Sequence, residues 1–212
     1  MDNTTNFEDI YPLATDVFSE WAERGKDEGM EKGHVDSVNF MIDKLKPKTQ
    51  TSFSALDIGC GNGWVVRRLR DIETCEVAIG VDGAKKMIEK AHRLDPLGKY
   101  FHADILEWSP MQKFSIIHSM EVLYYLENPL KAVNTIYTKW LEKGGTFIFG
   151  IDHYTENVPS LNWPAECGIN MNTQPIQYWL KIMSLTGFKN IQSWQIGAKN
   201  EWKGTLVIVG EK

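Results

Sequence analysis

Three glycines at alternate positions form the most informative pattern in this chain of 212 residues. Gly59, Gly61 and Gly63 follow a short apolar run, residues 54–58, and precede a run that reads as a helix. A glycine has no Cβ atom, so it adopts positive φ and lets a ligand lie against the backbone, while the helix beyond offers unpaired N–H groups. The pattern predicts a strand, a tight turn and a helix that bind a nucleotide-type ligand, with Cys60 as a small residue in the turn.

The spacing of the glycines narrows the class of ligand. A dinucleotide-binding turn needs G-x-G-x-x-G, but Trp64 stands at the third glycine position and Gly63 comes one residue early. Asp57 places a carboxylate before the turn, where a pyrophosphate would be repelled and a cation held. No Gly-Lys-Ser/Thr follows, which argues against a phosphate-binding loop. We therefore expect a nucleoside that carries a positive charge.

Candidate groups for proton transfer lie outside this turn. Glu121 follows a buried strand run, where its carboxylate could orient an amine or accept a proton, or could instead cap the next turn. His153 and Tyr154 begin a long polar and aromatic segment after another strand, which is where α/β folds place substrate groups. Packing over the sheet edge is the alternative for this segment, above all for Trp163. We rank the candidate bases as Glu121, then His153, then His34.

Strand-length apolar runs alternate with helical patterns along the chain. Strands are expected near 54–58, 76–81, 99–103, 114–119 and 145–151, and helices near 62–71, 84–92 and 128–141. This alternation predicts a parallel sheet with helices on both faces. A helix over 173–186 then precedes two strand runs, 191–196 and 205–209, whose short connection requires antiparallel pairing.

Five motifs in a fixed order, over about residues 54–151, resemble those of the class I S-adenosylmethionine-dependent methyltransferases. They are the turn Leu56-Asp57-Ile58-Gly59-Cys60-Gly61-Asn62-Gly63, the strand end Val81-Asp82-Gly83, the pair Asp104-Ile105, the segment Ser119-Met120-Glu121, and the turn Gly144-Gly145. The resemblance is to the small-molecule and ubiquinone-biosynthesis-like group, of type 11 or type 12. It implies a Rossmann-like seven-stranded α/β sheet, mostly parallel with a C-terminal antiparallel hairpin, and S-adenosylmethionine as cofactor with S-adenosylhomocysteine as product.

The resemblance also implies which residues hold the cofactor. Asp82 would bond the ribose hydroxyls, Asp104 would accept from the adenine amine, and Ile105 would cover a ring face. The full set is Asp57, Gly59, Cys60, Gly61, Asp82, Gly83, Met87, Asp104, Ile105, Ser119 and Met120. In such enzymes the methyl group moves by direct displacement from a positively charged sulfur. A dedicated base is therefore needed only when the acceptor must lose a proton.

The N-terminal region, residues 1–50, lies outside the cofactor-binding core. It reads as a helix, a glycine-rich loop over 25–34 and a second helix, and it resembles the helical lid of related methyltransferases. Trp21, Met30 and His34 either face the site or only dock the lid, and the sequence favours neither alternative.

The remaining segments follow the core, which spans residues 51–151. An insertion over 152–172 is expected to carry substrate choice, and a terminal helix and hairpin occupy 173–212, so that the whole chain would form one domain. Only one of Tyr124 and Tyr125 can face the pocket, and we expect Tyr124. The expected substrate-side residues are Trp21, Met30, Tyr124, Tyr154 and Trp163.

Composition limits the partners. The 28 acidic and 23 basic residues give a net charge of −5 with no basic cluster, which argues against nucleic acid. No apolar run approaches the roughly 20 residues of a membrane span, and residues 1–6 lack the features of a signal peptide, so we expect a cytoplasmic protein away from membranes. We expect it to be a monomer or a homodimer. No metal site is expected, because the three cysteines are scattered and His92 and His102 lack partners at ligand spacing. His118, inside a strand, is expected to be a hydrogen-bonded core residue.

A small-molecule methyl acceptor is the first expectation for function. The alternatives are a methyltransferase that acts on a protein or RNA, and a non-catalytic regulatory protein that binds the nucleoside. Asp57, Asp82 and Asp104 are all present, so nothing indicates a loss of cofactor binding. A dehydrogenase is set aside because of Trp64 and Asp57.

Overall fold

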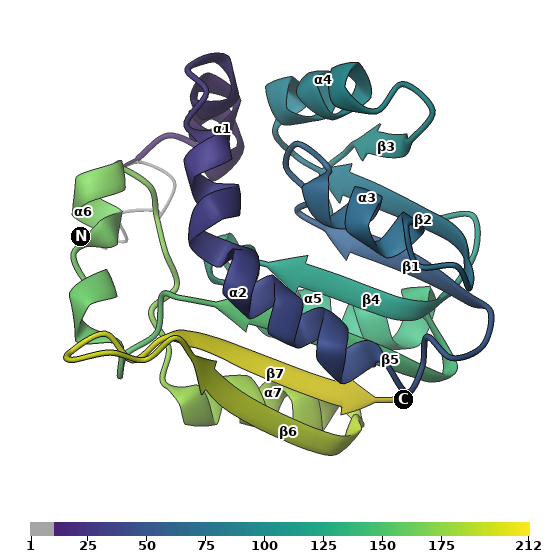
Figure 1. The fold of residues 1–212 in the computed structure, drawn as a ribbon. Helices are drawn as coiled ribbons and strands as arrows, with labels where there is room; N and C mark the ends of the chain where they lie inside the picture. Colours follow the sequence, from purple (N-terminus) through teal and green to yellow (C-terminus); the bar gives the residue numbers. More distant parts are fainter. Residues whose placement is uncertain (1–10) are drawn as a thin grey trace, which may run out of the picture.

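A seven-stranded sheet in the order β3-β2-β1-β4-β5-β7-β6 forms the centre of the computed structural model, which describes residues 11–212 (Figure 1). The strands are β1 Phe53–Ile58, β2 Cys75–Asp82, β3 Lys99–His102, β4 Phe114–Met120, β5 Leu141–Ile151, β6 Lys189–Ile196 and β7 Thr205–Glu211. The pairs among β1 to β5 are parallel, whereas β7 is antiparallel to both β5 and β6. The predicted Rossmann-like sheet with a C-terminal antiparallel hairpin is confirmed.

Helices cover both faces of this sheet (Figure 1). The α-helices of the described residues are α1 Ala14–Glu23, α2 Asp27–Leu45, α3 Trp64–Arg70, α4 Lys85–Leu94, α5 Pro129–Thr135, α6 Trp163–Cys167 and α7 Ile176–Thr186. Short 3₁₀ turns occur at Leu123–Tyr125 and Val158–Ser160, and a π-helical turn, Ile136–Trp140, continues α5 into β5. Helices α2, α3 and α4 pack on one face, and α5 and α7 pack on the other.

Alternate residues of the central strands point to opposite faces of the sheet, as the pleat requires. Ala55 lies in the cluster that contains Val38 of α2 and Leu69 of α3, whereas its neighbour Leu56 lies in the cluster that contains Trp179 of α7. Apolar layers therefore lie on both faces, which is the arrangement that parallel strands need. These layers hold the carboxyl ends of β1, β2 and β4 in fixed positions at one edge.

The N-terminal region differs from the expectation. Gly25 has φ +70° at the turn between α1 and α2, but α2 begins at Asp27 and contains Gly29 and Gly33, so the predicted loop over 25–34 is wrong. A glycine in a helix costs about 1 kcal/mol relative to alanine. The Glu, Lys and Met residues between these glycines are good helix formers, and the second half of α2 buries its apolar side on the sheet, which offsets that cost.

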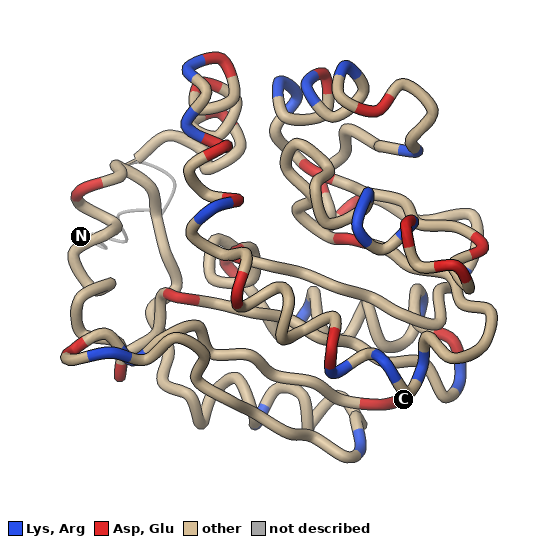
Figure 2. Tube along the Cα trace, in the orientation of Figure 1, with Lys and Arg blue, Asp and Glu red and all other residues tan. Residues whose placement is uncertain are grey.

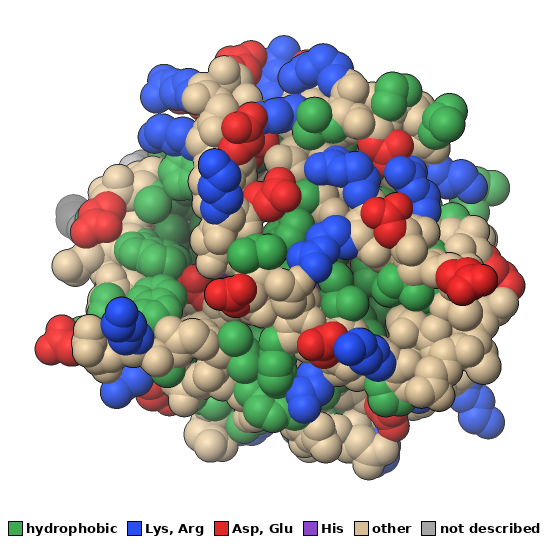
Figure 3. Space-filling model, in the orientation of Figure 1, with side chains coloured by type: hydrophobic (Ala, Val, Ile, Leu, Met, Phe, Trp, Pro, Cys, Tyr) green, Lys and Arg blue, Asp and Glu red, His purple; other side chains and the backbone are tan. Residues whose placement is uncertain are grey.

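Charged residues are distributed over the surface without a single basic face in the views shown. Lys and Arg positions follow the outer helices and turns (Figure 2), and basic and acidic side chains are interspersed on the face drawn in Figure 3. Within residues 11–212, no helix is both long enough and apolar enough to cross a membrane.

Candidate active site

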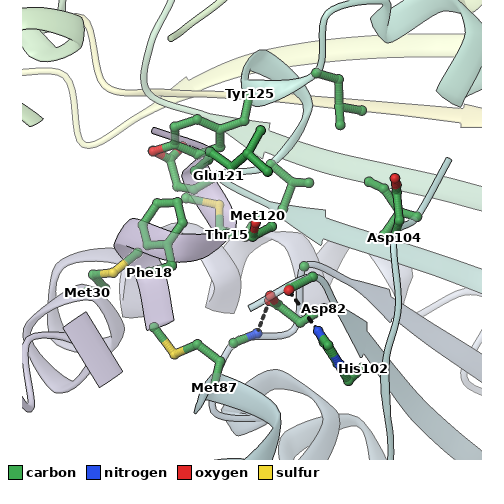
Figure 4. Close-up of a pocket in the computed structure, with 18 residues that line it drawn as sticks. Thr15, Phe18, Met30, Asp82, Met87, His102, Asp104, Met120, Glu121 and Tyr125 are labelled. Atoms are coloured by element: carbon green, nitrogen blue, oxygen red, sulfur yellow. Dashed lines mark hydrogen bonds between the residues drawn. The ribbon is translucent and has the colours of Figure 1, made fainter. Parts of the chain in front are cut away.

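A cavity of about 460 Å³ opens beside the carboxyl ends of β1, β2 and β4 and is bordered by the start of α1 (Figure 4). A second cavity of about 70 Å³ shares part of this lining and reaches toward α2. Gly59, Gly61, Met87, Met120 and Glu121 belong to both walls. The carboxyl ends of parallel strands are the usual ligand edge of such a sheet, so this is the candidate active site.

The glycine turn after β1 forms the floor between the two cavities. Gly59, Gly61 and Gly63 have φ values of +68°, +53° and +79°. A Cβ atom at Gly59 would collide with Val122, and one at Gly63 would collide with the ring of Tyr100. At Gly61 the nearest atom to such a Cβ is a sulfur 4.0 Å away, so the backbone there stays open to the cavity. The turn therefore needs glycine twice for packing and once for close approach of a ligand.

Asp82, at the end of β2, presents its carboxylate to the larger cavity. One oxygen accepts from the Gly61 N–H at 2.8 Å and the other accepts from the Ala84 N–H at 2.7 Å. Burial raises the pKa of Asp82, and these two hydrogen bonds oppose the rise. The bonds fix the carboxylate while leaving lone pairs that can accept from hydroxyl groups.

Asp57 borders the smaller cavity and does not act alone. It is 2% exposed, and its Oδ1 lies 2.7 Å from Nδ1 of the fully buried His118. The expectation that His118 is a hydrogen-bonded core residue is confirmed. Any ligand held by Asp57 therefore meets a carboxylate that already has an imidazole partner.

Helix α2 is tied to the glycine turn at its first residue. The buried carboxylate of Asp27 accepts from Nδ2 of Asn62 at 2.9 Å and from Nζ of Lys90 in α4 at 2.8 Å. We call these three residues the Asp27 latch. The latch joins α2, the turn after β1 and α4 at the rim of the smaller cavity.

Glu121 lies at the other end of the larger cavity, directly after β4. It adopts φ +59°, a left-handed conformation that costs of order 1 kcal/mol in a residue other than glycine. Its Oε1 accepts from the Asp152 backbone N–H at 2.6 Å, and its Oε2 accepts from the Tyr124 hydroxyl at 2.7 Å. Burial raises the pKa of Glu121 to about 8, and the negative charge of Asp152 adds to the rise.

His34 and Asp152 form an ion pair beside Glu121. The His34 Nε2 lies 3.3 Å from the Asp152 Oδ2, and its Nδ1 lies 2.7 Å from the Met30 carbonyl oxygen. Burial opposes the charged imidazole, but the bond to Asp152 and the charges of Glu121 and Asp152 raise the pKa of His34 to about 9. The Asp152 Oδ1 is buried and has no hydrogen-bond partner in the described part of the chain. Three elements that are distant in sequence thus assemble one buried group of ionisable side chains.

Tyr125, rather than Tyr124, lines the larger cavity, so the expected member of the pair differs. Tyr124 is 1% exposed and lies behind it, with the two hydroxyl oxygens 3.0 Å apart. The Tyr125 ring meets Phe18 of α1 edge to face, with ring centroids 5.2 Å apart. These side chains form an aromatic wall next to Glu121 (Figure 4).

The first residues of the 152–172 insertion do not line either cavity. Both ring nitrogens of His153 are engaged, with Nδ1 2.9 Å from the Ser160 carbonyl oxygen and Nε2 2.7 Å from the Thr173 hydroxyl. Tyr154 is fully buried, and its hydroxyl donates to the Gly204 carbonyl oxygen at 2.9 Å. The ring of Trp163 stacks on that of His153, with ring centroids 6.4 Å apart. These side chains bond to groups within the insertion and in the segments packed against it, which matches the packing alternative rather than a direct substrate role.

Other expected residues divide between cavity and core. Met30 lines both cavities, whereas Trp21 packs against Phe18 with ring centroids 5.2 Å apart and lines neither. Ser119 donates its hydroxyl hydrogen to the Ile58 carbonyl oxygen at 3.1 Å within the sheet. Sequence reasoning missed that Thr15 and Phe18 line the cavity, although the 3.6-residue period of α1 carries a signal for Phe18.

A family model described as a methyltransferase domain matches residues 26–193. The chain belongs to the class I S-adenosylmethionine-dependent methyltransferases. Over 89 residues it is 30% identical to trans-aconitate 2-methyltransferase from Agrobacterium fabrum, covering 42% of this chain and 34% of the relative. Over 99 residues it is 29% identical to tRNA U34 carboxymethyltransferase from Tolumonas auensis, and this match covers 44% of this chain and 30% of the relative. These matches span about a third of the length of the curated relatives.

Solved structures show the same fold. The chain superposes on one chain of a structure described as a complex between the Haloferax volcanii Trm112 methyltransferase activator and the putative methyltransferase, with a TM-score of 0.77 and 23% identity. The match covers 92% of this chain and 97% of that chain. At 23% identity, this similarity shows that the two chains share a fold.

The residues of the cavity fit the cofactor of this family. Asp82 offers carboxylate lone pairs to ribose hydroxyls, and the backbone at Gly61 is open. Asp104, whose Oδ1 accepts from the Leu106 N–H at 2.8 Å, keeps a second oxygen for an exocyclic amine, next to Ile105. The acidic lining suits a nucleoside with a positive charge.

Proposed function

We propose that this methyltransferase transfers a methyl group from S-adenosylmethionine to a small-molecule acceptor bound beside Glu121. The observation that carries the proposal is one continuous cavity with Asp82 at one end and Glu121 at the other (Figure 4). Met120 lies between them in the same wall. A volume of about 460 Å³ is within the range of small-molecule sites and leaves no platform for a large acceptor inside the cavity.

Each residue of the cofactor end has a role in this proposal. Asp82 holds the ribose, Asp104 and Ile105 meet the adenine, and Asp57 with His118 faces the positively charged amino acid part. The glycine turn, with Cys60 buried in it, and Gly83 and Met87 complete this wall. The cofactor, once bound, supplies a methyl group on a positively charged sulfur.

The chain's own contribution to the reaction is alignment, exclusion of water and acceptance of a proton. The rings of Phe18 and Tyr125 cover the acceptor end and keep water out. Glu121 accepts the proton that the acceptor loses, and its bonds to Tyr124 and to the Asp152 N–H hold the carboxylate in place. Alignment of two reactants in such a site is worth about 7–11 kcal/mol of the barrier.

Calorimetric titration with S-adenosylmethionine, S-adenosylhomocysteine and NAD tests the cofactor assignment. We expect both sulfur nucleosides to bind and NAD to fail, because the turn lacks the third glycine of a dinucleotide site. Radiolabelled-methyl transfer into a fraction of small metabolites then tests the acceptor. Binding of NAD alone would refute the proposal.

A macromolecular acceptor is the second candidate, because one relative is a tRNA U34 carboxymethyltransferase and a similar structure was solved with an activator protein. The same assay with total tRNA distinguishes the two candidates. Label in tRNA but not in small metabolites would favour the second. A cytoplasmic location, a single domain and a monomeric or homodimeric state belong to the proposal and are tested by fractionation and by scattering in solution.

A further inference from the structure

The charged residues that line the two cavities are mostly acidic. They are Asp27, Asp57, Asp82, Asp104 and Glu121, together with His34 and His102. No Lys or Arg lines either cavity in the part of the chain that the structure describes. Residues 1–10, outside that part, contain no Lys or Arg either. An anionic group on an acceptor would therefore meet carboxylates without a basic partner, which is unfavourable at short range in a partly desolvated site.

Among the described residues, Glu121 forms no ion pair with a basic side chain. Its hydrogen-bond donors, the Tyr124 hydroxyl and the Asp152 N–H, are neutral groups. The imidazole of His34 is paired with the Asp152 side chain at 3.3 Å. When all three side chains are ionised, two negative charges and one positive charge leave one net negative charge, and the buried Asp152 Oδ1 lacks a partner among the described residues.

The aromatic wall beside Glu121 adds a second preference for a cation. Phe18 and Tyr125 line the same cavity, and their rings meet edge to face with centroids 5.2 Å apart (Figure 4). The face of an aromatic ring attracts an ammonium group, by about 0.5–2 kcal/mol depending on desolvation. A carboxylate and two aromatic rings therefore converge on one small volume.

We propose that the methyl acceptor is a primary or secondary amine without an anionic group, held as its ammonium form by Glu121 against Phe18 and Tyr125. This inference rests on the proposed function and names its substrate class. It makes the enzyme an amine N-methyltransferase.

The ammonium gives one proton to the Glu121 carboxylate, which frees the nitrogen lone pair. The nitrogen forms a bond to the methyl carbon while the bond from that carbon to sulfur breaks, and its electron pair stays on sulfur to give the neutral thioether. The product is the N-methylated ammonium, and Glu121 then releases its proton to solvent.

The first experiment measures methyl transfer from radiolabelled S-adenosylmethionine into three pools of compounds that share their carbon skeletons. The pools are primary and secondary amines, the matching alcohols and the matching carboxylic acids, and binding of S-adenosylhomocysteine is measured on the same protein. We expect label in the amine pool at least tenfold above the other two. Label mainly in alcohols or acids, or in none of the pools, overturns the amine assignment while nucleoside binding keeps the cofactor assignment intact. Failure to bind the nucleoside overturns the proposed function itself.

A substitution at Glu121 tests the role of its charge. Glu121→Gln keeps the size of the side chain and should lower kcat/KM for the amine at least a hundredfold, with the dissociation constant of S-adenosylhomocysteine within about twofold of the original. Glu127→Gln is the matched control, since this exposed residue in the next turn lines neither cavity. Equal loss in both variants, or retained activity in Glu121→Gln, contradicts the assignment.

A divalent metal ion is the alternative occupant of this cluster. His34, Glu121 and Asp152 each offer one ligand atom, all within 4.8 Å of one another. Dialysis against EDTA, followed by addition of Mg²⁺, Mn²⁺ or Zn²⁺, distinguishes a site for an amine from a site for a metal ion. Activity on amines that is unchanged by EDTA supports the proposal, whereas loss with EDTA and recovery with one metal overturns it.

Discussion

The two ends of the cavity are built in different ways. At the cofactor end, Asp82 ends β2 and Asp104 follows β3, and each accepts a hydrogen bond from a backbone N–H two residues later in the chain. At the acceptor end, Glu121 meets His34 and Asp152 from helix α2 and the end of β5. The first end therefore combines local turns with contacts between strands, whereas the second consists only of residues that the tertiary fold brings together.

The two ends also differ in how well their charges are satisfied. Both oxygens of Asp82 accept from backbone N–H groups, so this carboxylate is fixed at little cost. Glu121 has a left-handed backbone and a pKa raised to about 8, and its neighbour Asp152 has a buried oxygen without a described partner. Strain and perturbed pKa values concentrate where chemistry is done, which supports the placement of the acceptor beside Glu121.

The acceptor end should dominate the pH dependence of stability. His34 and Glu121 have folded-state pKa values of about 9 and about 8, both above their ordinary values, so the folded protein binds protons more tightly than the unfolded chain. The stability they contribute is present at low pH and is lost as pH rises, between about 4.5 and about 8 for Glu121 and between about 6.5 and about 9 for His34. The loss amounts to several kcal/mol. His153, whose pKa burial lowers, acts in the opposite direction but only below its ordinary value of 6.5. Urea unfolding at pH 6.5 and pH 9 measures the effect, and Glu121→Gln should reduce it.

At the cofactor end, Asp82→Ala should weaken the binding of S-adenosylhomocysteine by about tenfold to a hundredfold. The variant loses the hydroxyl acceptor and leaves the Gly61 and Ala84 N–H groups unpaired, and a bond to a charged group is worth about 1.5–3 kcal/mol. Calorimetry measures the affinity, with circular dichroism as a check on folding. The exposed Glu107→Ala serves as the control. A folded Asp82→Ala protein with undiminished affinity would show that the ribose lies elsewhere.

Two histidines provide a direct test of which segment carries the chemistry. His34→Gln breaks the pair with Asp152 beside Glu121, so kcat should fall about tenfold while affinity for S-adenosylhomocysteine stays close to the original. His153→Gln disturbs the bonds to Ser160 and Thr173 and the ring contacts with Trp163 and Tyr124, none of which lines either cavity. It should therefore lower the melting temperature and leave kcat nearly unchanged. Steady-state kinetics and thermal melts of the two variants measure these effects. The reverse pattern would return the catalytic role to the insertion.

The smallest expected effect concerns helix α2. A Cβ atom at Gly29 or Gly33 meets nothing within 4 Å, and neither glycine has positive φ. Gly29→Ala and Gly33→Ala should therefore each stabilise the protein by up to about 1 kcal/mol, or about 2–4 °C in melting temperature. Gly25→Ala, at φ +70°, should destabilise it and is the matched control. Loss of stability in all three would mean that the loop expected from the sequence is present in solution.

Much of the sheet and the cofactor end was predictable because its signals are local. Apolar runs located β1, β2 and β4, and Asp57, Asp82 and Glu121 were found by their positions at or directly after the carboxyl ends of these strands. The acceptor end was only partly predictable. Glu121 could be ranked first among the candidate bases by its place after β4. Its contact with Asp152 could not be predicted, because that contact depends on the pairing of β4 with β5. Position after a strand also predicted that His153 reaches the cavity, which is wrong. The sequence does not reveal that its two ring nitrogens are hydrogen-bonded to Ser160 and Thr173.

Helix α2 carries the Asp27 latch at its first residue and His34 two turns later. Because one rigid helix holds both contacts, a displacement that opens the rim near the glycine turn also pulls His34 away from Asp152. We therefore expect the binding of cofactor and acceptor to be thermodynamically linked, with each ligand changing the affinity for the other by the same factor. An acceptor that requires His34 in place then binds more tightly to the cofactor-loaded protein, which favours an ordered sequence of binding.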